Sequence, residues 1–147
     1  MKDKKTKPLN DEALTLKIMN HLKLAGLRAT RQRIELGRLL FSGEDRHMTA
    51  ENLYVEAKSA GMSISLATIY NTLHQFTQAG MLRQVVVDPS RSYFDTNITD
   101  HHHFFFADEG ELIDIPHDKI QLSSLPRLPK GLELEGVDVV VRVTREK

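Results

Sequence analysis

The chain has 147 residues, of which 40% are hydrophobic and 27% are charged. This composition is that of an ordinary soluble protein with one or two small domains. No apolar stretch approaches the length of a transmembrane helix, so a membrane function is excluded and a cytoplasmic protein is expected. The sequence contains no cysteine, which excludes disulfides, thiolate metal sites and cysteine nucleophiles. Any metal site must therefore use histidine, a carboxylate or the main chain.

The net charge of zero hides a difference between the two parts of the chain. Residues 1–95 carry 14 Lys and Arg against 10 Asp and Glu, whereas residues 96–147 carry 6 against 10. A basic part joined to an acidic part indicates that only the first meets a polyanion such as DNA. A solvated surface without a partner is the alternative explanation.

Three amphipathic helices are expected in the first part, after a lysine-rich mobile arm over residues 1–8 that lacks the apolar core of a signal peptide. The first helix begins after a cap at Asn10 and ends at Gly26. Thr30 can cap the second, and Thr49 can cap the third, which ends near Gly61. Three arginines cluster at the start of the second helix: Arg28, Arg31 and Arg33.

A fourth helix is predicted from a cap at Ser65 to Gly80, with an apolar stripe on one face. The opposite face carries small or amide-bearing side chains and no charge: Ala67, Thr68, Asn71, Thr72 and Gln75. Charged residues normally dominate an exposed helix face, whereas these side chains can approach base edges in a major groove without clash. The face therefore indicates a DNA-reading helix.

Two strands around a turn follow, over residues 81–87 and 92–95, with Pro89 and Arg91 in the turn. Helices followed by a hairpin favour a winged helix-turn-helix. A small helical domain with an incidental hairpin is the alternative on pattern alone.

The most unusual stretch runs from Asp95 to Phe106 and contains three consecutive histidines, followed by three phenylalanines. Its residue types predict a strand, and alternation then puts His101 and His103 on one face and His102 on the other. Imidazole with carboxylate suits zinc, ferrous iron or manganese, and imidazole beside aromatic rings also suits haem iron. A solvated histidine patch is the bland alternative.

The remaining part is predicted to contain a strand over residues 111–115, a short helix over residues 119–125 and a strand over residues 136–144. This lobe is too small for a self-sufficient core without disulfides or another subunit. A small sheet with so apolar a face is best explained as a dimerisation unit. Packing against the first lobe is the competing explanation.

An ordered set of motifs in this sequence resembles the ferric uptake regulator family. The motifs cover nearly the whole chain and are GLRATRQR from Gly26, HMTAENLY from His47, SLATIY from Ser65, AGMLR from Ala79, YFD from Tyr93 and the histidine cluster. Within the family, the unbroken histidine and phenylalanine run and the missing cysteines look most like the iron response regulators of alphaproteobacteria.

The resemblance implies an α+β homodimeric transcription regulator, mainly a repressor of iron and haem homeostasis genes. It would have an N-terminal winged helix-turn-helix DNA-binding domain over residues 1–95 and a small C-terminal αβ dimerisation domain, which also senses metal or haem, over residues 96–147. Regulators of this kind act when iron is scarce and are inactivated by haem. The implied partners are an AT-rich inverted repeat in double-stranded DNA, a second copy of the chain and haem.

The chain departs from the family pattern at three places. The sequence Phe106-Ala-Asp-Glu109 stands where many relatives carry a Cys-x-x-Cys zinc pair. Asn71 replaces the arginine that usually follows the tyrosine of the recognition helix, which puts the usual operator in doubt. Some iron response regulators bear a Cys-Pro haem motif near the N-terminus, and the absence of cysteine excludes it here.

The resemblance assigns a divalent-metal site (Zn, Mn or Fe) between the lobes, with Asp95 where many members have glutamate: His47, Asp95, His101 and His103. Asp100 and His102 are candidates for a second metal site, and His101, His102 and His103 for haem. Ser65, Thr68, Tyr70 and Asn71 are expected to meet bases or nearby phosphates. Arg28, Arg31, Arg33 and Arg91 are expected on the DNA backbone, with a surface ion pair as the alternative for each arginine.

Two other functions compete with a haem-responsive regulator. One is a repressor of the same family that responds to a divalent metal or to peroxide without haem. The other, from a different class, is a small metal-dependent hydrolase that uses the histidine cluster to activate water. The sequence shows no nucleophile motif or phosphate loop for an enzyme, so a DNA-binding regulator is favoured.

Overall fold

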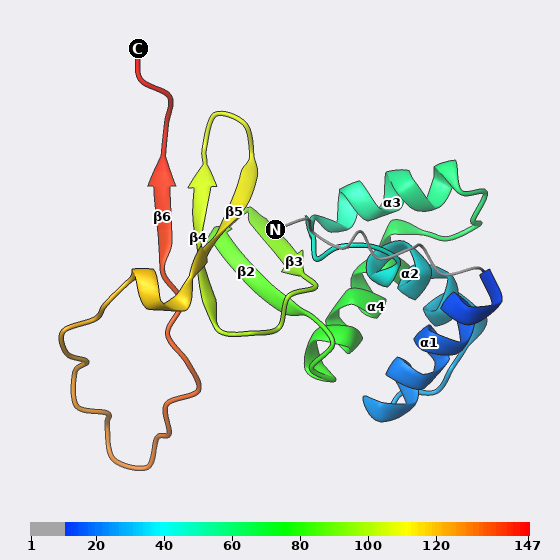
Figure 1. The fold of residues 1–147 in the computed structure, drawn as a ribbon, viewed down its shortest axis with the longest axis horizontal. Helices are drawn as coiled ribbons and strands as arrows, with labels where there is room; N and C mark the ends of the chain where they lie inside the picture. Colours follow the sequence, from blue (N-terminus) through cyan, green and yellow to red (C-terminus); the bar gives the residue numbers. More distant parts are fainter. Residues whose placement is uncertain (1–10) are drawn as a thin grey trace, which may run out of the picture. The chain divides into compact units, whose positions relative to one another are not determined.

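The computed structural model describes residues 11–147, which fold as two compact units (Figure 1). The first unit ends at Ile98, and the second runs from Thr99 to Lys147. The domain boundary predicted from the sequence lies between residues 95 and 96, and this boundary between the two functional domains stays a prediction. None of the helices within residues 11–147 combines the length and apolar character that a membrane span requires.

The first unit contains four helices: α1 (Asp11–Leu24), α2 (Arg31–Phe41), α3 (Ala50–Ser59) and α4 (Leu66–Gln78). The three predicted caps are confirmed, because the side chains of Thr30, Thr49 and Ser65 each accept a hydrogen bond from a backbone N–H three residues on. Such caps satisfy amide groups that have no partner inside the helix. The predicted cap at Asn10 and the predicted arm over residues 1–8 lie outside the described residues.

The apolar stripes of the four helices meet in one core that includes Ile18, Leu36, Leu53 and Phe76. Helices α1 and α2 approach each other closely at Gly37, where an added Cβ would lie 2.6 Å from Cγ2 of Ile18. A glycine is therefore required at this crossing.

One prediction about α4 is wrong, because Thr72 belongs to the buried side of the helix and not to its exposed face. Its position three residues after Ile69 and four before Phe76 places it on the apolar stripe. Its hydroxyl is satisfied within the helix, where it donates to the carbonyl of Thr68 at 2.9 Å.

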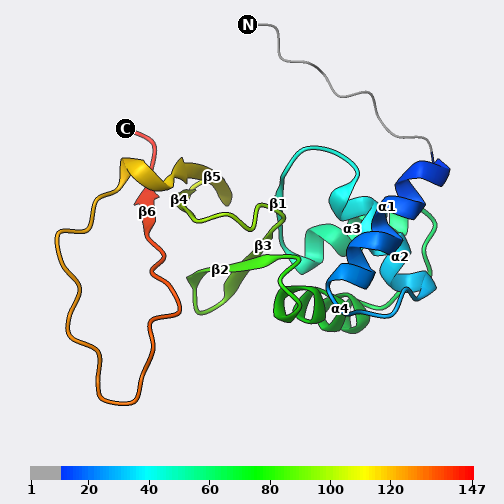
Figure 2. The ribbon, with the colours of Figure 1, turned by 60° about the horizontal axis from the view of Figure 1, so that its bottom comes forward.

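The first unit also contains a three-stranded antiparallel sheet of order β1-β3-β2. Its strands are β1 (His47–Met48), β2 (Arg83–Asp88) and β3 (Arg91–Asp95). The expected hairpin is present as β2 and β3, and its tip points away from the helices (Figure 2). The short β1 pairs with β3 in a register that sets His47 opposite Asp95.

The second unit is a three-stranded sheet of order β5-β4-β6. The strands are β4 (His101–Phe106), β5 (Glu111–Pro116) and β6 (Val140–Val143), with a single 3-10 turn, η1 (His117–Lys119), after β5. The central strand β4 runs antiparallel to β5 and parallel to β6. The histidine strand is therefore the middle of its sheet.

Two predictions in the second unit need correction. The short helix expected over residues 119–125 is wrong, because only η1 forms and residues 120–139 contain no further helix or strand. Two adjacent serines precede Pro126 there, and so short a helix would be marginal without a packed face. The last strand begins at Val140 and not at residue 136. The carbonyl of Val139 still accepts the backbone N–H of His103 at 3.2 Å, but its own N–H donates to the His102 ring at 3.1 Å instead of to a backbone carbonyl of β4.

Candidate metal centre and nucleic-acid interface

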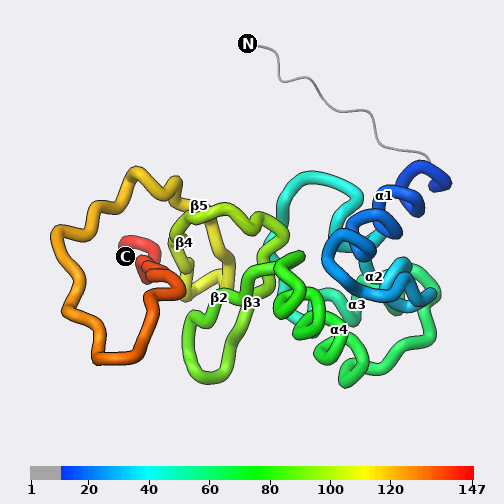
Figure 3. Tube along the Cα trace, turned by 90° about the horizontal axis from the view of Figure 1, so that it is seen from below, coloured from blue at the N-terminus to red at the C-terminus, as the bar shows by residue number. Residues whose placement is uncertain are grey.

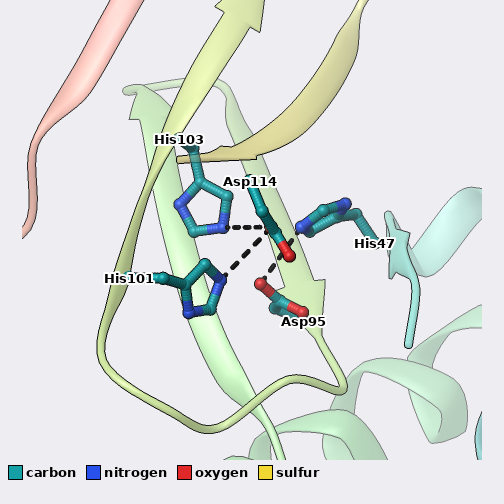
Figure 4. Close-up of side chains that lie close together, drawn as sticks. All are labelled: His47, Asp95, His101, His103 and Asp114. Atoms are coloured by element: carbon teal, nitrogen blue, oxygen red, sulfur yellow. Dashed lines mark ion pairs between the residues drawn. The ribbon is translucent and has the colours of Figure 1, made fainter. Parts of the chain in front are cut away.

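In the first unit, the pairing of β1 with β3 brings an imidazole and a carboxylate together. Nε2 of His47 lies 3.1 Å from Oδ2 of Asp95 (Figure 4). Asp95 is fully buried, and its other oxygen accepts a hydrogen bond from the backbone N–H of Asn97 at 2.8 Å. A buried carboxylate requires a positive partner. A protonated imidazole or a bound cation can supply it here.

Arg46, the residue before His47, fixes β1 in place. Its guanidinium donates to both carboxylate oxygens of Glu56, at 2.9 and 2.7 Å, and to the carbonyl of Leu39 at 3.3 Å. Its backbone N–H donates to the hydroxyl of Thr96 at 2.8 Å. Forked guanidinium pairs of this kind have little freedom to move. The position of His47 is therefore built into the scaffold of the first unit.

In the second unit, the alternation of β4 places His101 and His103 on one face, as predicted. The ring centroids lie 4.5 Å apart, and both side chains are buried. Oδ1 of Asp114, on β5, lies 3.3 Å from Nε2 of His101 and 3.4 Å from Nε2 of His103 (Figure 4). Two imidazole nitrogens and a carboxylate oxygen thus converge on one point.

The hydrogen bonding of His101 leaves room for a proton or a metal ion at that point. Its Nδ1 lies 2.5 Å from the carbonyl oxygen of Thr99, and because a carbonyl can only accept, Nδ1 carries the hydrogen. The lone pair of Nε2 in the neutral ring then faces the carboxylate of Asp114, which also only accepts. A proton or a metal ion between them removes this conflict. Metal-bound histidines are commonly oriented by such a bond to a carbonyl, and the N/O set suits zinc, ferrous iron or manganese.

Asp114 is a candidate ligand that was not predicted from the sequence. The signal was present, since a turn at residues 107–110 joins two antiparallel strands and fixes the register that sets His103 opposite Asp114. An acidic residue that is flanked by isoleucines near the middle of this strand then lies beside the histidines. The register of the hairpin, and not the residue pattern of one strand, identifies it.

The candidates for a second site are arranged differently. Nδ1 of His102 accepts the backbone N–H of Val139, and its ring stacks on His117 with centroids 6.0 Å apart. In the neutral ring, Nε2 then carries the hydrogen and is not ready to bind a metal. Within residues 11–147, neither Asp100 nor His102 joins a group of three or more side chains suited to a metal.

The predicted DNA-reading residues lie at the start and on the exposed side of α4. Asn71 and Gln75 are exposed, and Thr68 is half-buried. Ser65 is exposed, and its hydroxyl contacts that of Thr68 at 2.8 Å while it caps the helix. The Tyr70 hydroxyl donates to the carboxylate of Glu51 at 2.5 Å, a hydrogen bond that raises the pKa of Tyr70 above its ordinary value.

The predicted phosphate-binding arginines make local contacts within the first unit. The Arg33 guanidinium donates to the carbonyl of Arg28 at 2.9 Å and to the Gln75 side chain at 3.1 Å, which ties the start of α2 to α4. Arg31 pairs with Glu35 at 3.2 Å, and Arg91 pairs with Asp88 at 2.9 Å. Both arginines are exposed, and their acidic partners are half-buried. Ion pairs this close to solvent contribute little to stability. The side chain of Arg28 is exposed.

An uncharged exposed helix surface beside arginines, with converging imidazole and carboxylate ligands elsewhere in the chain, is the combination found in metal-responsive transcription regulators. Residues 24–142 match the model of the ferric uptake regulator family, and the chain belongs to this family. Proteins of the family bind DNA and are dimers. They are transcription regulators and not enzymes, so the hydrolase alternative is wrong.

Relatives of known sequence and structure agree with this assignment. The chain is 32% identical over 130 residues to the ferric uptake regulation protein of Pseudomonas aeruginosa, covering 87% of this chain and 97% of that protein. It also resembles the structure of the Pseudomonas aeruginosa ferric uptake regulator with manganese, with a TM-score of 0.66, 28% identity and coverage of 88% and 98%. The Vibrio cholerae ferric uptake regulator gives a TM-score of 0.67, 25% identity and coverage of 86% and 98%.

Proposed function

We propose that this chain is a cytoplasmic, homodimeric repressor of iron homeostasis genes in which one divalent cation binds both ligand sets. His47 and Asp95 would supply the ligands of the first unit, and His101, His103 and Asp114 those of the second. The convergence of His101, His103 and Asp114 carries this proposal, because two imidazole nitrogens and a carboxylate oxygen meet where one divalent cation could bind all three. Only residues 96–100 connect the two sets, and a linker of that length spans at most about 21 Å.

A shared ion gives a physical route from metal to DNA affinity. Ligands from both units would fix the angle between them, and in a dimer this angle sets the spacing of the two DNA-reading helices. Manganese is the first ion to test, because a related regulator from Pseudomonas aeruginosa is known with manganese. The candidate second site at Asp100 and His102 stays a prediction, since only the resemblance supports it.

Metal stoichiometry tests the shared site directly. The wild type should bind one manganese ion per chain, and His47→Ala and His103→Ala should each abolish stoichiometric binding, as measured by calorimetry. His117→Ala is the matched control, because its side chain is exposed and lies outside both ligand sets. If each single variant retained tight binding of one ion, the two ligand sets would be independent and the shared site would be refuted.

We propose that DNA is read by α4, with α3 and α4 as a helix-turn-helix and the β2–β3 hairpin as its wing. Ser65, Thr68, Tyr70 and Asn71 would meet bases or nearby phosphates of an AT-rich inverted repeat. Arg28, Arg31, Arg33 and Arg91 would bind the DNA backbone. The exposed, uncharged surface of α4 beside the arginines of the same unit supports this assignment.

Fluorescence anisotropy with an AT-rich inverted repeat and a random duplex separates the two kinds of contact. Arg28→Ala should weaken both duplexes alike and lower the slope of log affinity against log salt by about 0.9. Tyr70→Ala should instead reduce discrimination between the duplexes. Lys58→Ala, an exposed cation on α3, is the control for lost charge. Equal affinity of the wild type for both duplexes at every salt concentration would refute sequence-specific binding.

We also propose that haem inactivates the regulator at His101, His102 and His103, as the resemblance to iron response regulators implies. Imidazole is a good axial ligand for haem iron, and the neighbouring Phe104 side chain, 37% exposed, can cover part of a porphyrin. The three imidazoles are buried, so the strand must loosen before iron can reach them. Haem would therefore bind slowly and compete with the divalent metal for His101 and His103.

Haem titration into the preformed protein–DNA complex tests this role. The wild type should release DNA near one haem per chain, and a variant with all three histidines replaced by alanine should not. A variant with His74 and His117 replaced by alanine controls for adventitious binding to histidine. Release that is identical in the wild type and the triple variant would exclude the triplet as the site, and the metal-responsive repressor without haem would then stand.

A further inference from the structure

The segment between η1 and β6, residues 120–139, is called the arm from here on, and it is distinct from the N-terminal arm predicted over residues 1–8. It has no regular secondary structure, and it stands away from the sheet of its own unit as an open loop (Figures 1, 2 and 3). The arm exposes five leucines, each between 45% and 61% accessible: Leu122, Leu125, Leu128, Leu132 and Leu134. Exposed apolar surface of this extent marks an interaction site in a small unit.

The arm has a three-residue repeat, since residues 125–130 read Leu-Pro-Arg-Leu-Pro-Lys. A polyproline II segment has three residues per turn, so each kind of residue lines up along one side. Leu122, Leu125 and Leu128 would form an apolar stripe, with Arg127 on another side. The segment ends at Lys130, where the N–H of Leu132 donates to the carbonyl of Pro129 and closes a turn. Because proline fixes φ, such a segment is already extended and loses little conformational entropy when it binds.

The sheet of the same unit presents a matching surface, the phenylalanine face. Phe104 and Phe106 lie on the side of β4 opposite His101 and His103. The strand registers set Ile113 and Val141 beside Phe104, and Glu111 and Val143 beside Phe106. Ile113 is 45% exposed, and Phe104 is 37% exposed. A pocket of about 290 Å³ lies on this face, lined by Phe104, Phe106 and residues 143–146.

We propose that the arm of one chain packs its leucine stripe on the phenylalanine face of a second copy. The arm and the face belong to the same unit, yet both remain exposed, so the arm does not cover the face of its own chain. A two-fold exchange would cover both surfaces in both chains with one contact made twice. The basic residues of the arm, Arg127 and Lys130, are complementary in charge to Glu111 at the edge of the face. The inference rests on the proposed dimer and identifies what holds it together.

Disulfide cross-linking tests which chain the arm covers, because the sequence contains no cysteine. Leu125→Cys protein and Phe104→Cys protein are unfolded, mixed, refolded together and oxidised. Intact mass should show a disulfide-linked pair that contains one chain of each kind. Leu24→Cys, at an exposed leucine of α1, replaces Phe104→Cys in the control mixture and should give no mixed pair.

A double variant with both cysteines in one chain completes this test. If it forms an internal disulfide while the mixture of single variants gives no mixed pair, the arm covers its own chain and the inference is overturned.

Dimer dissociation gives an independent test by analytical ultracentrifugation. Replacement of Leu122, Leu125 and Leu128 by serine should raise the dissociation constant by about tenfold per leucine. The matched control replaces three exposed residues of the helical unit by serine: Leu16, Leu24 and Val55. A dimer as tight in the arm variant as in the control would overturn the inference and leave the dimer intact. A wild-type chain that stays monomeric at all concentrations would overturn the dimer itself.

Discussion

Asp114→Asn should weaken manganese binding without a change in the fold. The carboxylate oxygen that lies 3.3 and 3.4 Å from two imidazole nitrogens becomes a neutral amide oxygen of the same shape. Loss of this charged ligand is expected to reduce affinity about 100-fold, since even groups that only orient a ligand are worth roughly 10- to 100-fold. At a metal concentration about 1,000 times the wild-type Kd, the ion stabilises the wild type by about 4.1 kcal/mol and the variant by about 1.4 kcal/mol.

The assay is thermal unfolding at pH 8, with and without excess manganese. The expected difference of about 2.7 kcal/mol corresponds to a metal-dependent rise in Tm that is about 5–11 °C smaller in the variant. Glu111→Gln, on the same strand, is the control for the loss of one negative charge. An equal rise in Tm for Asp114→Asn and the wild type would show that Asp114 is not a ligand.

Three further predictions concern the first unit. Gly37→Ala should lower the free energy of unfolding, measured in urea, by about 1–3 kcal/mol, because the added Cβ meets Ile18 Cγ2 at 2.6 Å. A second substitution, Ile18→Leu, removes the β-branch of Ile18 and should restore most of the lost stability. If Gly37→Ala were as stable as the wild type, the close helix crossing would be contradicted. Glu51→Gln should lower the pKa of Tyr70 toward 10.0 in an ultraviolet titration, because the hydrogen bond to Glu51 is the main cause of its raised pKa; an unchanged pKa would remove that cause. Hydrogen bonds from Ser90 lower the pKa of Asp88 from 3.8 to about 2. The stabilising effect of the Asp88 carboxylate should therefore be complete above pH 3.8 and vanish as the pH falls through 2. If the stability difference between Asp88→Asn and the wild type were the same across this pH range, the lowered pKa would be contradicted.

The helices were predictable because their signals are local. Thr30, Thr49 and Ser65 cap the helices that follow them, and apolar spacing gives the buried faces. The exception is the helix expected over residues 119–125, where the apolar residues have no packed surface to bury them and Pro126 follows. A local signal therefore predicts an element only where the rest of the fold supplies a partner.

The site was predictable in part, because its residues meet through strand registers. The two-residue strand β1 has no sequence pattern of its own, and only its pairing with β3 sets His47 opposite Asp95. Alternation along β4 correctly predicts that His101 and His103 share a face. The position of Asp114 beside the histidines depends on the register between β4 and β5, and this register could be derived only from the turn that joins them. The hydrogen bond from the Arg46 backbone to Thr96, which helps to fix His47, joins segments that are 50 residues apart, so no local pattern could reveal it.

The parallel pairing of β6 with β4 determines when the second sheet can form. The hairpin of β4 and β5 closes across a turn at residues 107–110, whereas β6 must return from residue 140 to pair with His103. Loop-closure entropy makes the longer return costlier by about 2 kcal/mol. The hairpin should therefore form first in refolding, and it already holds His101, His103 and Asp114. The three proposed ligands of this unit would be in place before β6 pairs with β4, so binding of the proposed ion would not depend on the folding of the C-terminal residues.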